Sequence, residues 1–584
     1  MSLFKKTWSI FDHKQRKYLM FIFILMFVSM LLETLSIGII LPLLSIFLKN
    51  EIDSSILSYF FIFGQPTEKN LIFVGLSVTL VIFLTKNLFL TFNHWQNTKF
   101  LEKTNLEISN KLFKSYLKRD YIFFIKTNTA QLYRNVTAEI ASFIEYINRY
   151  IIFSSEIIIF FGIAALLLYL DFLGTMIILF LVSVSSFVIY TLTKKKIDIY
   201  AKERISVAGE LNKHVMQGFF SAKDVKILDR EENLIHQVYI NLVKNAEIGV
   251  FMKFIGGLPK FLFEFLVVCV FIVLVLSMIY LERNPLDIIM YLGVFAVASF
   301  RLIPGASRIF ISLQEIKFRR TSVNLLSNEL NAKDNSYVKK NTQQKNFNQP
   351  IKFQRQINVK NLCFSYPTRK EFSLSEISMN IKKGESIGII GETGSGKSTL
   401  INLFIGLLKP SKGKVEVDEL NILSNLSGWY KKIGYVPQSI YLMDDTIKKN
   451  IAFGLRDDDI DDVLIKKAVE KASLNTLLNN LPNGLETIVG ERGIGLSGGQ
   501  QQRIGIARAL YRDPEILILD EATSSLDNTT EKKIMDSIEL LKRKITLLIV
   551  THRLSTVNKC DKIFFIDKGK ITKQGSPKEI LQEL

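Results

Sequence analysis

A glycine-rich segment in the second half of the chain has the residue types that bind nucleotide phosphates. It reads GETGSGKST, and it lies between SIGII, a short β-type run, and LINLFIGLL, which has helical length and composition. In a strand–loop–helix unit of this kind, loop N–H groups surround phosphate oxygens, a lysine adds positive charge and a hydroxyl group binds Mg²⁺. We therefore predict a site for ATP and Mg²⁺, with Ser398 as a metal ligand, formed by Gly391, Thr393, Gly394, Ser395, Gly396, Lys397, Ser398 and Thr399.

Two adjacent carboxylates end a second apolar run. The segment ILILDE has the pattern of a buried strand followed by Asp520 and Glu521. Phosphoryl transfer depends on positioning and charge compensation, so we expect Asp520 to bind Mg²⁺ and Glu521 to orient or deprotonate the attacking water. Taken alone, two acids at this place are as typical of a solvated turn, and the interpretation depends on the motifs around them.

A third motif, LSGGQQQR at residues 496–503, has the pattern of the ABC ATPase signature. With it, the chain resembles an ABC exporter half-transporter over nearly its whole length. The resemblance implies that Tyr366 in FSYP stacks on adenine and that Gln438 in GYVPQ is the Q-loop residue, with a catalytic and Mg²⁺-binding role. It also implies that His552 in VTHR is the switch histidine, which contacts the γ-phosphate in this family.

The resemblance further implies that the active unit contains two chains. In this family each ATP lies between Lys397 of one subunit and the signature of the other, so one chain cannot complete a site. Every catalytic element is present, which favours two equal sites in a homodimer, although the intact partner of a heterodimer would have the same sequence features. The residues expected on the facing side are Ser497, Gly498, Gly499 and Gln500, together with GERG at 490–493 and the D-loop residue Asp527 in SSLD.

ATP binding is then expected to clamp the two ATPase domains together, and hydrolysis is expected to release them. The resemblance places short cytoplasmic helices of the membrane domain against the ATPase domains near Gln438. The candidate segments are RDYIFFIKTNTAQL at 119–132 and GFFSAKDVKILDRE at 218–231. Their residue spacing does not distinguish them from ordinary amphipathic turns.

The elements that must position these residues follow from an abrupt change of composition along the 584 residues. Ile, Leu, Phe and Val dominate up to about residue 320, and short apolar runs between Gly-rich turns begin at about residue 351. A membrane span needs about 20 mostly apolar residues. Six stretches are long enough: 19–48, 70–95, 142–170, 172–193, 253–281 and 286–313.

We therefore predict a multi-domain protein. A six-helix transmembrane domain of ABC exporter type occupies residues 1–330, a polar linker occupies 331–350, and a cytoplasmic α/β P-loop nucleotide-binding domain occupies 351–584. The first apolar stretch is too long for a signal-peptide core and is read as a retained span.

Basic residues indicate the orientation in the membrane. The segments 96–141 and 194–252 are rich in Lys and Arg, so these loops and both termini are predicted to be cytoplasmic, in a bacterial inner membrane. This bias accounts for much of the formal net charge of +19, and no nucleic-acid-binding module is visible. Three cysteines far apart suggest neither a disulfide framework nor a metal site.

Four cations fall within or near the inner half of the predicted membrane domain: Lys86, Lys260, Arg301 and Arg308. Arg301 and Arg308 are seven residues apart and share one helical face, where they could bind a phosphate or pyrophosphate headgroup. A structural alternative stays open. Glu264 could pair with Lys260, while Glu33 and Glu156 could neutralise other cations, and Arg308 or Lys260 could extend to the interface.

The membrane domain also resembles that of bacterial ABC-type flippases for lipid-linked oligosaccharides. The similarity lies in LLETLSIGIILPLL at 31–44, LPKFLFE at 258–264 and FRLIPGASRI at 300–309. It implies that the four cations line a cavity and engage the lipid pyrophosphate. It also implies a short interfacial helix at SILSYFFIF, within 49–69, where an ordinary hydrophobic loop end is an equal alternative.

The expected activity is therefore ATP-driven flipping of a lipid-linked saccharide, or a similar pyrophosphate lipid, from the cytoplasmic to the outer face. A broad-specificity lipid or multidrug exporter is the alternative within transport, and it would need no cationic patch. An ATP-gated channel or regulator is the alternative of another class. Intact Glu521 and His552 argue against that alternative, because a gate needs only to bind the nucleotide.

Overall fold

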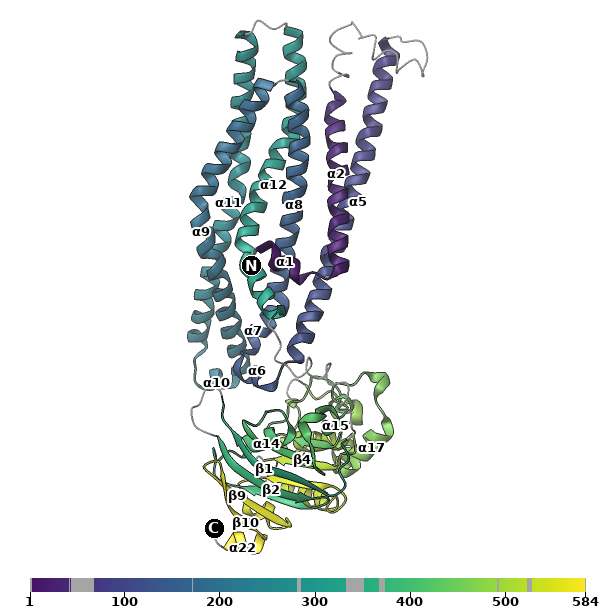
Figure 1. The fold of residues 1–584 in the computed structure, drawn as a ribbon, viewed down its shortest axis with the longest axis vertical. Coiled ribbons are helices and arrows are strands. Elements are labelled where there is room, and N and C mark those ends of the chain that lie inside the picture. The colour runs from purple at the N-terminus through teal and green to yellow at the C-terminus, as the bar shows by residue number, and fades with distance from the viewer. Residues whose placement is uncertain are drawn as a thin grey trace. The chain divides into compact units, whose positions relative to one another are not determined.

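The computed structural model describes residues 3–40, 43, 68–170, 172–280, 285–331, 351–366, 373–490, 493–522 and 528–582 (Figure 1). The chain divides into two compact units. The helical unit comprises Met1–Arg119 and Phe124–Asn335, and the sheet unit comprises Asp120–Phe123 and Ser336–Leu584. The predicted linker beyond Asn331, the predicted interfacial helix within 49–69 and Asp527 lie outside the described residues.

The helical unit consists of long helices and a few short ones. In chain order they are α1 (Leu3–Ile10), α2 (His13–Gly38), α5 (Glu68–Leu117), α6 (Tyr121–Lys126), α7 (Thr129–Arg134), the π-helix η2 (Asn135–Glu139), α8 (Ile140–Leu170), α9 (Phe172–Phe220), α10 (Ala222–Ile227), α11 (Glu231–Tyr280) and α12 (Pro285–Asn331), of which α6 begins in the sheet unit. Among the described residues, six helical segments are long and apolar enough to cross a membrane, as the sequence predicts. They indicate a multi-pass membrane protein.

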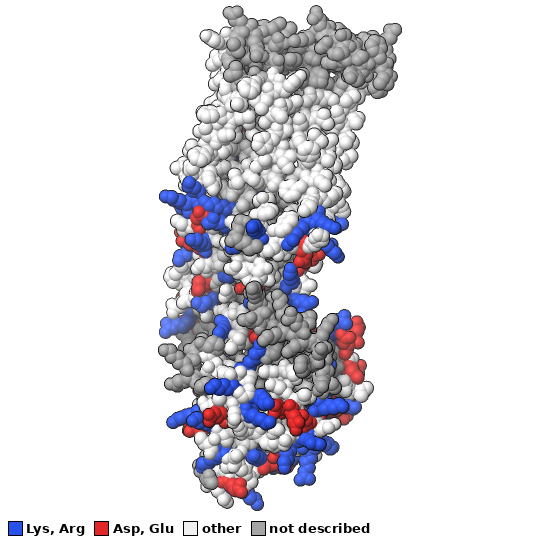
Figure 2. Space-filling model, viewed as in Figure 1, with Lys and Arg blue, Asp and Glu red and all other residues white. Residues whose placement is uncertain are grey.

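Most of these helices extend well past their apolar stretches. The helix α5 has 50 residues, and at about 1.5 Å per residue it is much longer than the roughly 30 Å hydrocarbon core of a bilayer. The polar segments that follow the apolar stretches therefore continue the same helices. On the face shown in Figure 2, charged side chains gather toward one end of the helical unit, and the rest of its described surface has almost none.

The helical unit is held together by apolar packing and by close helix approaches. The helices α8 and α12 lie side by side, and so do α2 and α5 (Figure 1). Ile159, Ile163 and Phe295 are buried in one of its apolar clusters. A Cβ atom at Gly162 would lie 2.6 Å from the Met30 sulfur, so the Met30 side chain on α2 would have to shift to admit a larger residue on α8.

A buried ionic contact joins the π-helix η2 to two other helices. The Glu139 side chain is fully buried, and its Oε2 accepts hydrogen bonds from Arg204 Nη2 at 3.1 Å and from Ser322 Oγ at 2.6 Å. These donors lie on α9 and α12. The last residue of η2 is therefore fixed to two other helices immediately before α8 begins.

The described part of the sheet unit contains two sheets. The larger has the order β10-β9-β3-β8-β7-β6, in which β9, β3, β8, β7 and β6 are parallel and β10 is antiparallel to β9. The smaller is antiparallel, with the order β2-β1-β4-β5. The strands are β1 (Gln356–Phe364), β2 (Leu374–Lys382), β3 (Ser386–Ile390), β4 (Lys412–Val417), β5 (Leu420–Asn421), β6 (Ile433–Val436), β7 (Ile516–Asp520), β8 (Thr546–Val550), β9 (Lys562–Asp567) and β10 (Lys570–Gly575).

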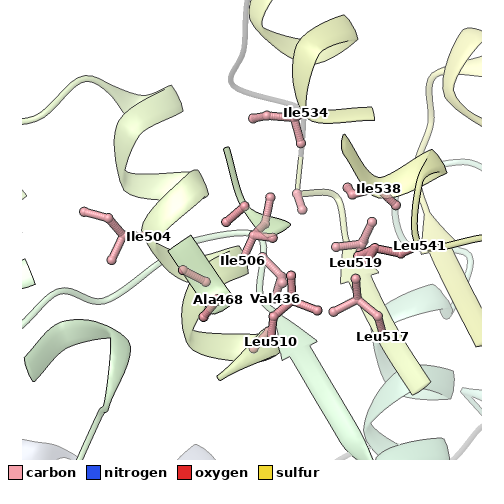
Figure 3. Packing of buried hydrophobic residues seen from close by; sticks show 14 of the residues in the cluster. Val436, Ala468, Ile504, Ile506, Leu510, Leu517, Leu519, Ile534, Ile538 and Leu541 are labelled. Carbon is pink, nitrogen blue, oxygen red and sulfur yellow. The ribbon is translucent and has the colours of Figure 1, made fainter. Parts of the chain in front are cut away.

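Helices and short 3₁₀ turns connect these strands. They are α14 (Lys397–Ile405), η3 (Ile422–Ser424), α15 (Leu426–Tyr430), α16 (Ile447–Ile451), η4 (Asp457–Asp459), α17 (Asp462–Lys471), α18 (Asn475–Asn479), η5 (Gly484–Glu486), α19 (Gly498–Leu510), α20 (Asn528–Glu539), α21 (Leu554–Val557) and α22 (Pro577–Gln582). Every residue of β3, β7 and β8 is buried, as expected for central strands of a parallel sheet. Figure 3 shows Leu517 and Leu519 of β7 packed with Ile506 and Leu510 of α19 and with Ile538 of α20.

Asp418 holds the backbone of the segment that leads into β1. Its carboxylate follows β4 and accepts hydrogen bonds from the backbone N–H groups of Gln354, Arg355 and Gln356, the last at 2.8 Å. Burial opposes ionisation of Asp418, but these N–H groups outweigh it and hold its pKa below the usual value. The segment that leads into β1 is thus held by an anion bound to backbone dipoles.

Candidate functional site

A cavity of about 1230 Å³ in the sheet unit collects residues from five separate motifs. Its lining comes from the Gly-rich loop after β3, the ends of β6, β7 and β8, and the segment after β1. The residues predicted from the sequence that line it are Tyr366, Gly391, Thr393, Gly394, Gly396, Lys397, Ser398, Thr399, Gln438, Glu521 and His552. Parallel strands place their carboxyl ends at one edge of the sheet, which explains why such distant residues meet.

Two glycines shape the loop that forms one wall of the cavity. Gly391 has a φ of +156°, and a Cβ atom there would lie 2.1 Å from the carbonyl oxygen of Ile566. Gly396 has a φ of +108° and precedes the first residue of α14. The backbone therefore turns tightly and directs the N-terminus of a nine-residue helix at the cavity, an arrangement that favours anions.

Lys397 is held inside this loop by neutral groups. Its side chain is buried, and its ammonium group donates hydrogen bonds to the carbonyl oxygens of Gly391 at 2.8 Å and Glu392 at 2.9 Å. Within the described chain, the buried Ser395 hydroxyl has no hydrogen-bond partner. A buried cation and an unsatisfied hydroxyl group beside a helix N-terminus fit a phosphate group, so the residues present fit ATP with Mg²⁺.

Glu521, Gln438 and His552 form another part of the cavity lining. Glu521 accepts a hydrogen bond from Gln438 Nε2 at 2.8 Å, and His552 Nδ1 lies 3.7 Å from its Oε1. Asp520 precedes it at the end of β7 and accepts a hydrogen bond from the Tyr435 hydroxyl at 3.1 Å. Burial raises the pKa of Asp520, and the Tyr435 hydrogen bond offsets part of that rise. Two groups able to orient water or move a proton, Gln438 and His552, thus converge on Glu521.

Glu521 also has an unusual backbone. Its φ is +47°, in the left-handed region that residues with a side chain adopt at a cost. The Glu521 N–H donates to the carbonyl oxygen of Val550 on β8, which fixes this conformation. Strained backbone of this kind clusters at functional sites, and here it accompanies a carboxylate directed into the cavity.

Tyr435 is a site residue that the sequence motifs alone do not predict. The parallel pairing of β6 with β7 sets Val436 opposite Leu519, which brings Tyr435 close to Asp520. Burial and the Asp520 charge raise the pKa of Tyr435, so its hydroxyl group stays protonated and donates. The sequence signal is its place in GYVPQ, three residues before Gln438, but strand order is needed to show which residue it contacts.

The predicted adenine and signature residues lie in different surroundings. The Tyr366 hydroxyl is 3.3 Å from Thr399 Oγ1 at the cavity. Ser497 begins α19, and its hydroxyl accepts from the Gln500 N–H at 3.3 Å while Gln500 Oε1 accepts from the Ser497 N–H at 2.8 Å. None of the four predicted signature residues, all of them described, lines the cavity of its own chain.

The helical unit contains a second charged site, here called the charge cluster: Glu33, Lys86, Glu156, Arg301 and Arg308. Arg301 lies 3.0 Å from Glu33 through Nε and 3.0 Å from Glu156 through Nη1. Arg308 Nε is 2.7 Å from Glu156, and Lys86 Nζ is 3.6 Å from Glu33. The alternative in which Glu33 and Glu156 neutralise intramembrane cations therefore matches the observed pairing.

Lys260 does not join the charge cluster. Its side chain on α11 is exposed, and it forms no ion pair with any described residue, including Glu264 four residues along the same helix. Three of the four predicted cations converge on two carboxylates, and the fourth lies apart from them. That all four line one cavity stays a prediction.

Comparisons with known proteins extend these observations. Residues 374–524 match a family model described as ABC transporter. An ATP-dependent lipid A-core flippase of Vibrio vulnificus (strain YJ016) is 38% identical over 233 residues, 39% of each chain. ABC transporter B family member 21 of Arabidopsis thaliana is 41% identical over 229 residues, 39% of this chain and 18% of the relative. The chain thus spans about two fifths of the flippase and less than a fifth of the plant relative.

A solved structure covers nearly the whole chain. A bacterial Atm1-family ABC exporter with ATP bound superposes with a TM-score of 0.78 over 97% of both chains, at 20% identity. Such similarity concerns the fold. It confirms the predicted fold class of six apolar helices followed by an α/β nucleotide-binding domain.

Proposed function

We propose that this chain, which has the fold of an ABC exporter half-transporter, uses ATP hydrolysis to flip a lipid with an anionic headgroup across a bacterial inner membrane. A lipid-linked oligosaccharide or a similar pyrophosphate lipid is the proposed cargo, moved from the cytoplasmic to the outer face. The observation that carries the ATPase part is the single cavity containing Lys397, Gln438, Glu521 and His552. The match of residues 374–524 to the ABC transporter model supports it.

The cavity residues suggest a division of labour in hydrolysis. Lys397 and the N–H groups of the Gly-rich loop bind the phosphates, and Tyr366 supports the adenine. Ser398, Gln438 and Asp520 would hold Mg²⁺, which supplies charge compensation for the transferring phosphoryl group. Glu521 accepts the proton of the attacking water.

His552 and Gln438 act on the water and on Glu521 by position. The Gln438 amide already donates to one Glu521 oxygen at 2.8 Å, which leaves the other oxygen toward His552. His552 is the proposed contact of the γ-phosphate. The strained backbone at Glu521 supports this assignment, because it keeps the carboxylate directed into the cavity.

A second copy of the chain is the proposed partner that completes each site. The signature residues Ser497 and Gly498 lie outside the cavity of their own chain, so they are available to another chain. On the helical unit, the end of α10 exposes Ile227 by 70% and the adjoining Leu228 by 63%. Apolar side chains in a predicted cytoplasmic loop are also typical of a surface that a partner covers.

Residues 120–123 support the proposed coupling between nucleotide and transport. These four residues belong to the sheet unit by their contacts. Within it, Ile122 packs against the buried cluster that contains Trp429, and the Asp120 carboxylate lies 3.9 Å from Lys409 Nζ. These contacts within the sheet unit support the proposed role of residues 120–123 in coupling.

The charge cluster and the relatives support an anionic lipid as cargo. Three cations and two carboxylates leave one excess positive charge among the apolar helices. Ionisable residues among membrane-spanning helices cost free energy, and they usually face a cavity or pair with another group. Several relatives are named ATP-dependent lipid A-core flippases, and the cargo in that name is a lipid.

The test is lipid translocation and ATP hydrolysis in proteoliposomes with the full chain. The variants are Glu521→Gln, Arg308→Ala and the control Arg319→Ala, which removes an arginine of the same helix that pairs with Glu315 at 2.7 Å outside the charge cluster. The cargoes are a polyprenyl diphosphate sugar and an uncharged glycolipid. We expect wild type and Arg319→Ala to flip the diphosphate lipid and Arg308→Ala to lose that activity while retaining ATP hydrolysis.

Other outcomes select the alternatives. Equal movement of both cargoes by wild type and Arg308→Ala would favour a broad-specificity lipid or multidrug exporter. Lipid movement that needs ATP binding but survives Glu521→Gln would favour an ATP-gated channel or regulator. Loss of hydrolysis in Arg308→Ala but not in Arg319→Ala would show that the charge cluster maintains the fold and does not bind the cargo.

A further inference from the structure

The two arginines of the charge cluster differ in how many of their nitrogen atoms donate hydrogen bonds. Arg301 donates through Nε to Glu33 and through Nη1 to Glu156. Arg308 donates through Nε to Glu156, and its terminal nitrogens have no hydrogen-bond partner among the described residues. The Arg308 side chain is 43% exposed, against 21% for Arg301. The terminal nitrogens of Arg308 are therefore open to a ligand, while Arg301 is engaged by both carboxylates.

Glu156 is the residue that connects the two arginines. Its two oxygens bind different guanidinium groups, Oε2 at 3.0 Å from Arg301 and Oε1 at 2.7 Å from Arg308. Its side chain is only 11% exposed, so these two cations, more than water, balance the carboxylate charge. A carboxylate bridging two guanidinium groups occupies the place that a phosphate group would take.

The helix α12 is shaped to allow this bridge. A Cβ atom at Gly305 would lie 3.0 Å from Glu156 Oε2 and 3.6 Å from Arg301 Nη1. Any larger residue at position 305 would crowd the carboxylate at the point where it contacts Arg301. Pro304 stands beside it inside the helix, between the two arginines.

We propose that Glu156 is an internal counter-anion that a phosphate-bearing headgroup must displace from Arg301 and Arg308, and whose return promotes release. This inference rests on the proposed function for its cargo. The headgroup first contacts the terminal nitrogens of Arg308, and it then replaces the Glu156 carboxylate at both arginines. No covalent bond changes, because one anion replaces another on the same donors.

The exchange explains selectivity as well as release. An uncharged ligand that separated Glu156 from the arginines would leave buried charges without partners, which is strongly unfavourable. An anion compensates the arginines as it displaces the carboxylate, and the excess positive charge of the cluster favours its arrival. Glu33 stays paired with Lys86 and with Arg301 Nε, so Arg301 keeps its position during the exchange.

The test measures binding and turnover of the full-length protein in lipid nanodiscs. The probe is a polyprenyl diphosphate, and a polyprenol of the same chain length is the uncharged comparison. The variant is Glu156→Gln, and the matched control is Glu145→Gln, which removes a carboxylate of the same helix paired with Arg149 at 2.7 Å outside the cluster.

Removing the competing anion should strengthen binding and slow release. We expect the Kd of the diphosphate to fall by roughly 10-fold in Glu156→Gln, the size of one charge-assisted hydrogen bond, with slower lipid movement per ATP hydrolysed. Polyprenol binding and the Glu145→Gln control should match wild type. An unchanged or higher Kd in Glu156→Gln would overturn the inference, because Glu156 would then only position the arginines.

A second variant decides the matter if Glu156→Gln does not fold. Gly305→Ala crowds Glu156 without removing a charge, so it should also lower the Kd of the diphosphate, and a higher Kd would overturn the inference. Failure of the proposed function is distinguishable. Diphosphate binding by wild type that is not tightened in either variant refutes the exchange alone, whereas no diphosphate binding by wild type or variants refutes both.

Discussion

The two charged sites of this chain hold their cations with different kinds of acceptor. In the sheet unit, Lys397 donates to the backbone carbonyl oxygens of Gly391 and Glu392. In the helical unit, Arg301 donates to the carboxylates of Glu33 and Glu156. A phosphate group can replace neutral carbonyl dipoles at little cost, whereas it must compete with a full negative charge to reach Arg301. The nucleotide site can therefore bind an anion directly. At the charge cluster, an incoming anion must first displace a carboxylate of the protein.

The largest expected effect would come from removing Glu521, the proposed base of the nucleotide site. Glu521→Gln should reduce the rate of ATP hydrolysis by about 10² to 10⁴-fold, because the amide cannot accept the proton of the attacking water. Nucleotide binding should persist, since the phosphate-binding loop is unchanged. The measurement is steady-state hydrolysis with nucleotide binding measured in parallel.

Glu392→Gln provides the control for that prediction. Glu392 lines the same cavity but lies on the Gly-rich loop after β3, whereas Glu521 follows β7. Its variant should hydrolyse ATP at close to the wild-type rate. Equal loss of hydrolysis in both variants would mean that general electrostatics of the cavity, not one base, governs the reaction.

A direct comparison of the two sites uses one substitution in each. Arg301→Met leaves Glu33 and Glu156 buried without their shared cation, so it should lower the free energy of unfolding by about 3 to 5 kcal/mol. Lys397→Met should lower it by less than about 1 kcal/mol, since water entering the cavity can hydrogen-bond the two carbonyl oxygens. Denaturation in detergent micelles measures both, and equal losses would contradict the distinction between the sites.

A smaller effect is expected at Tyr435, whose hydroxyl group donates to Asp520 at 3.1 Å. Tyr435→Phe keeps the ring but removes the donor that orients the carboxylate. We expect the Mg²⁺ concentration for half-maximal ATP hydrolysis to rise by roughly 10-fold, as for loss of one hydrogen bond to a charged group. Titration with Mg²⁺ checks this, and Tyr441→Phe, an exposed tyrosine after Gln438, should leave it unchanged.

The smallest effect concerns Asp418, an anion held by backbone N–H groups and so the counterpart of Lys397. Asp418→Asn keeps an oxygen acceptor but loses the charge, and it should lower the free energy of unfolding by about 1 kcal/mol at neutral pH. The folded state has the lower pKa, so this stabilisation is present above the unfolded pKa of about 3.9 and is lost as the pH falls through the folded value.

Unfolding measured from pH 7 downward tests the sign of this effect. The difference between wild type and Asp418→Asn should vanish in acid. Glu419→Gln, at the next position, should follow the wild type throughout. A difference that grew in acid would show that the backbone donors do not hold the carboxylate in its charged form.

The sequence is a good guide to the nucleotide site and a partial guide to the charge cluster. Short motifs predict the cavity residues because most of them end a strand of one parallel sheet, so strand order gathers them without further information. In long helices, a residue's partner depends on rotation about the helix axis and on which helices are neighbours. The sequence therefore names Glu33 and Glu156 as possible counter-ions but cannot assign them to Arg301, nor separate Lys260 from the others.

Two further features depend on the tertiary structure. The contact between Tyr435 and Asp520 requires that β6 lies beside β7, which the separation of 85 residues along the chain conceals. The loops predicted at 96–141 and 194–252 are largely continuations of α5, α9 and α11, because polar residues with helical propensity extend a helix as readily as they end it.

The π-helix at Asn135–Glu139 sets the angular phase of the helix that follows it. One residue turns an α-helix by about 100°, so a one-residue deletion that converted this turn to ordinary α-helix would rotate all of α8 relative to the helices before it. Glu139 is fixed to α9 and α12 at one end of that rotation, and Glu156 lies 17 residues further along. A single extra residue just before α8 thus determines which way the carboxylate of the charge cluster faces.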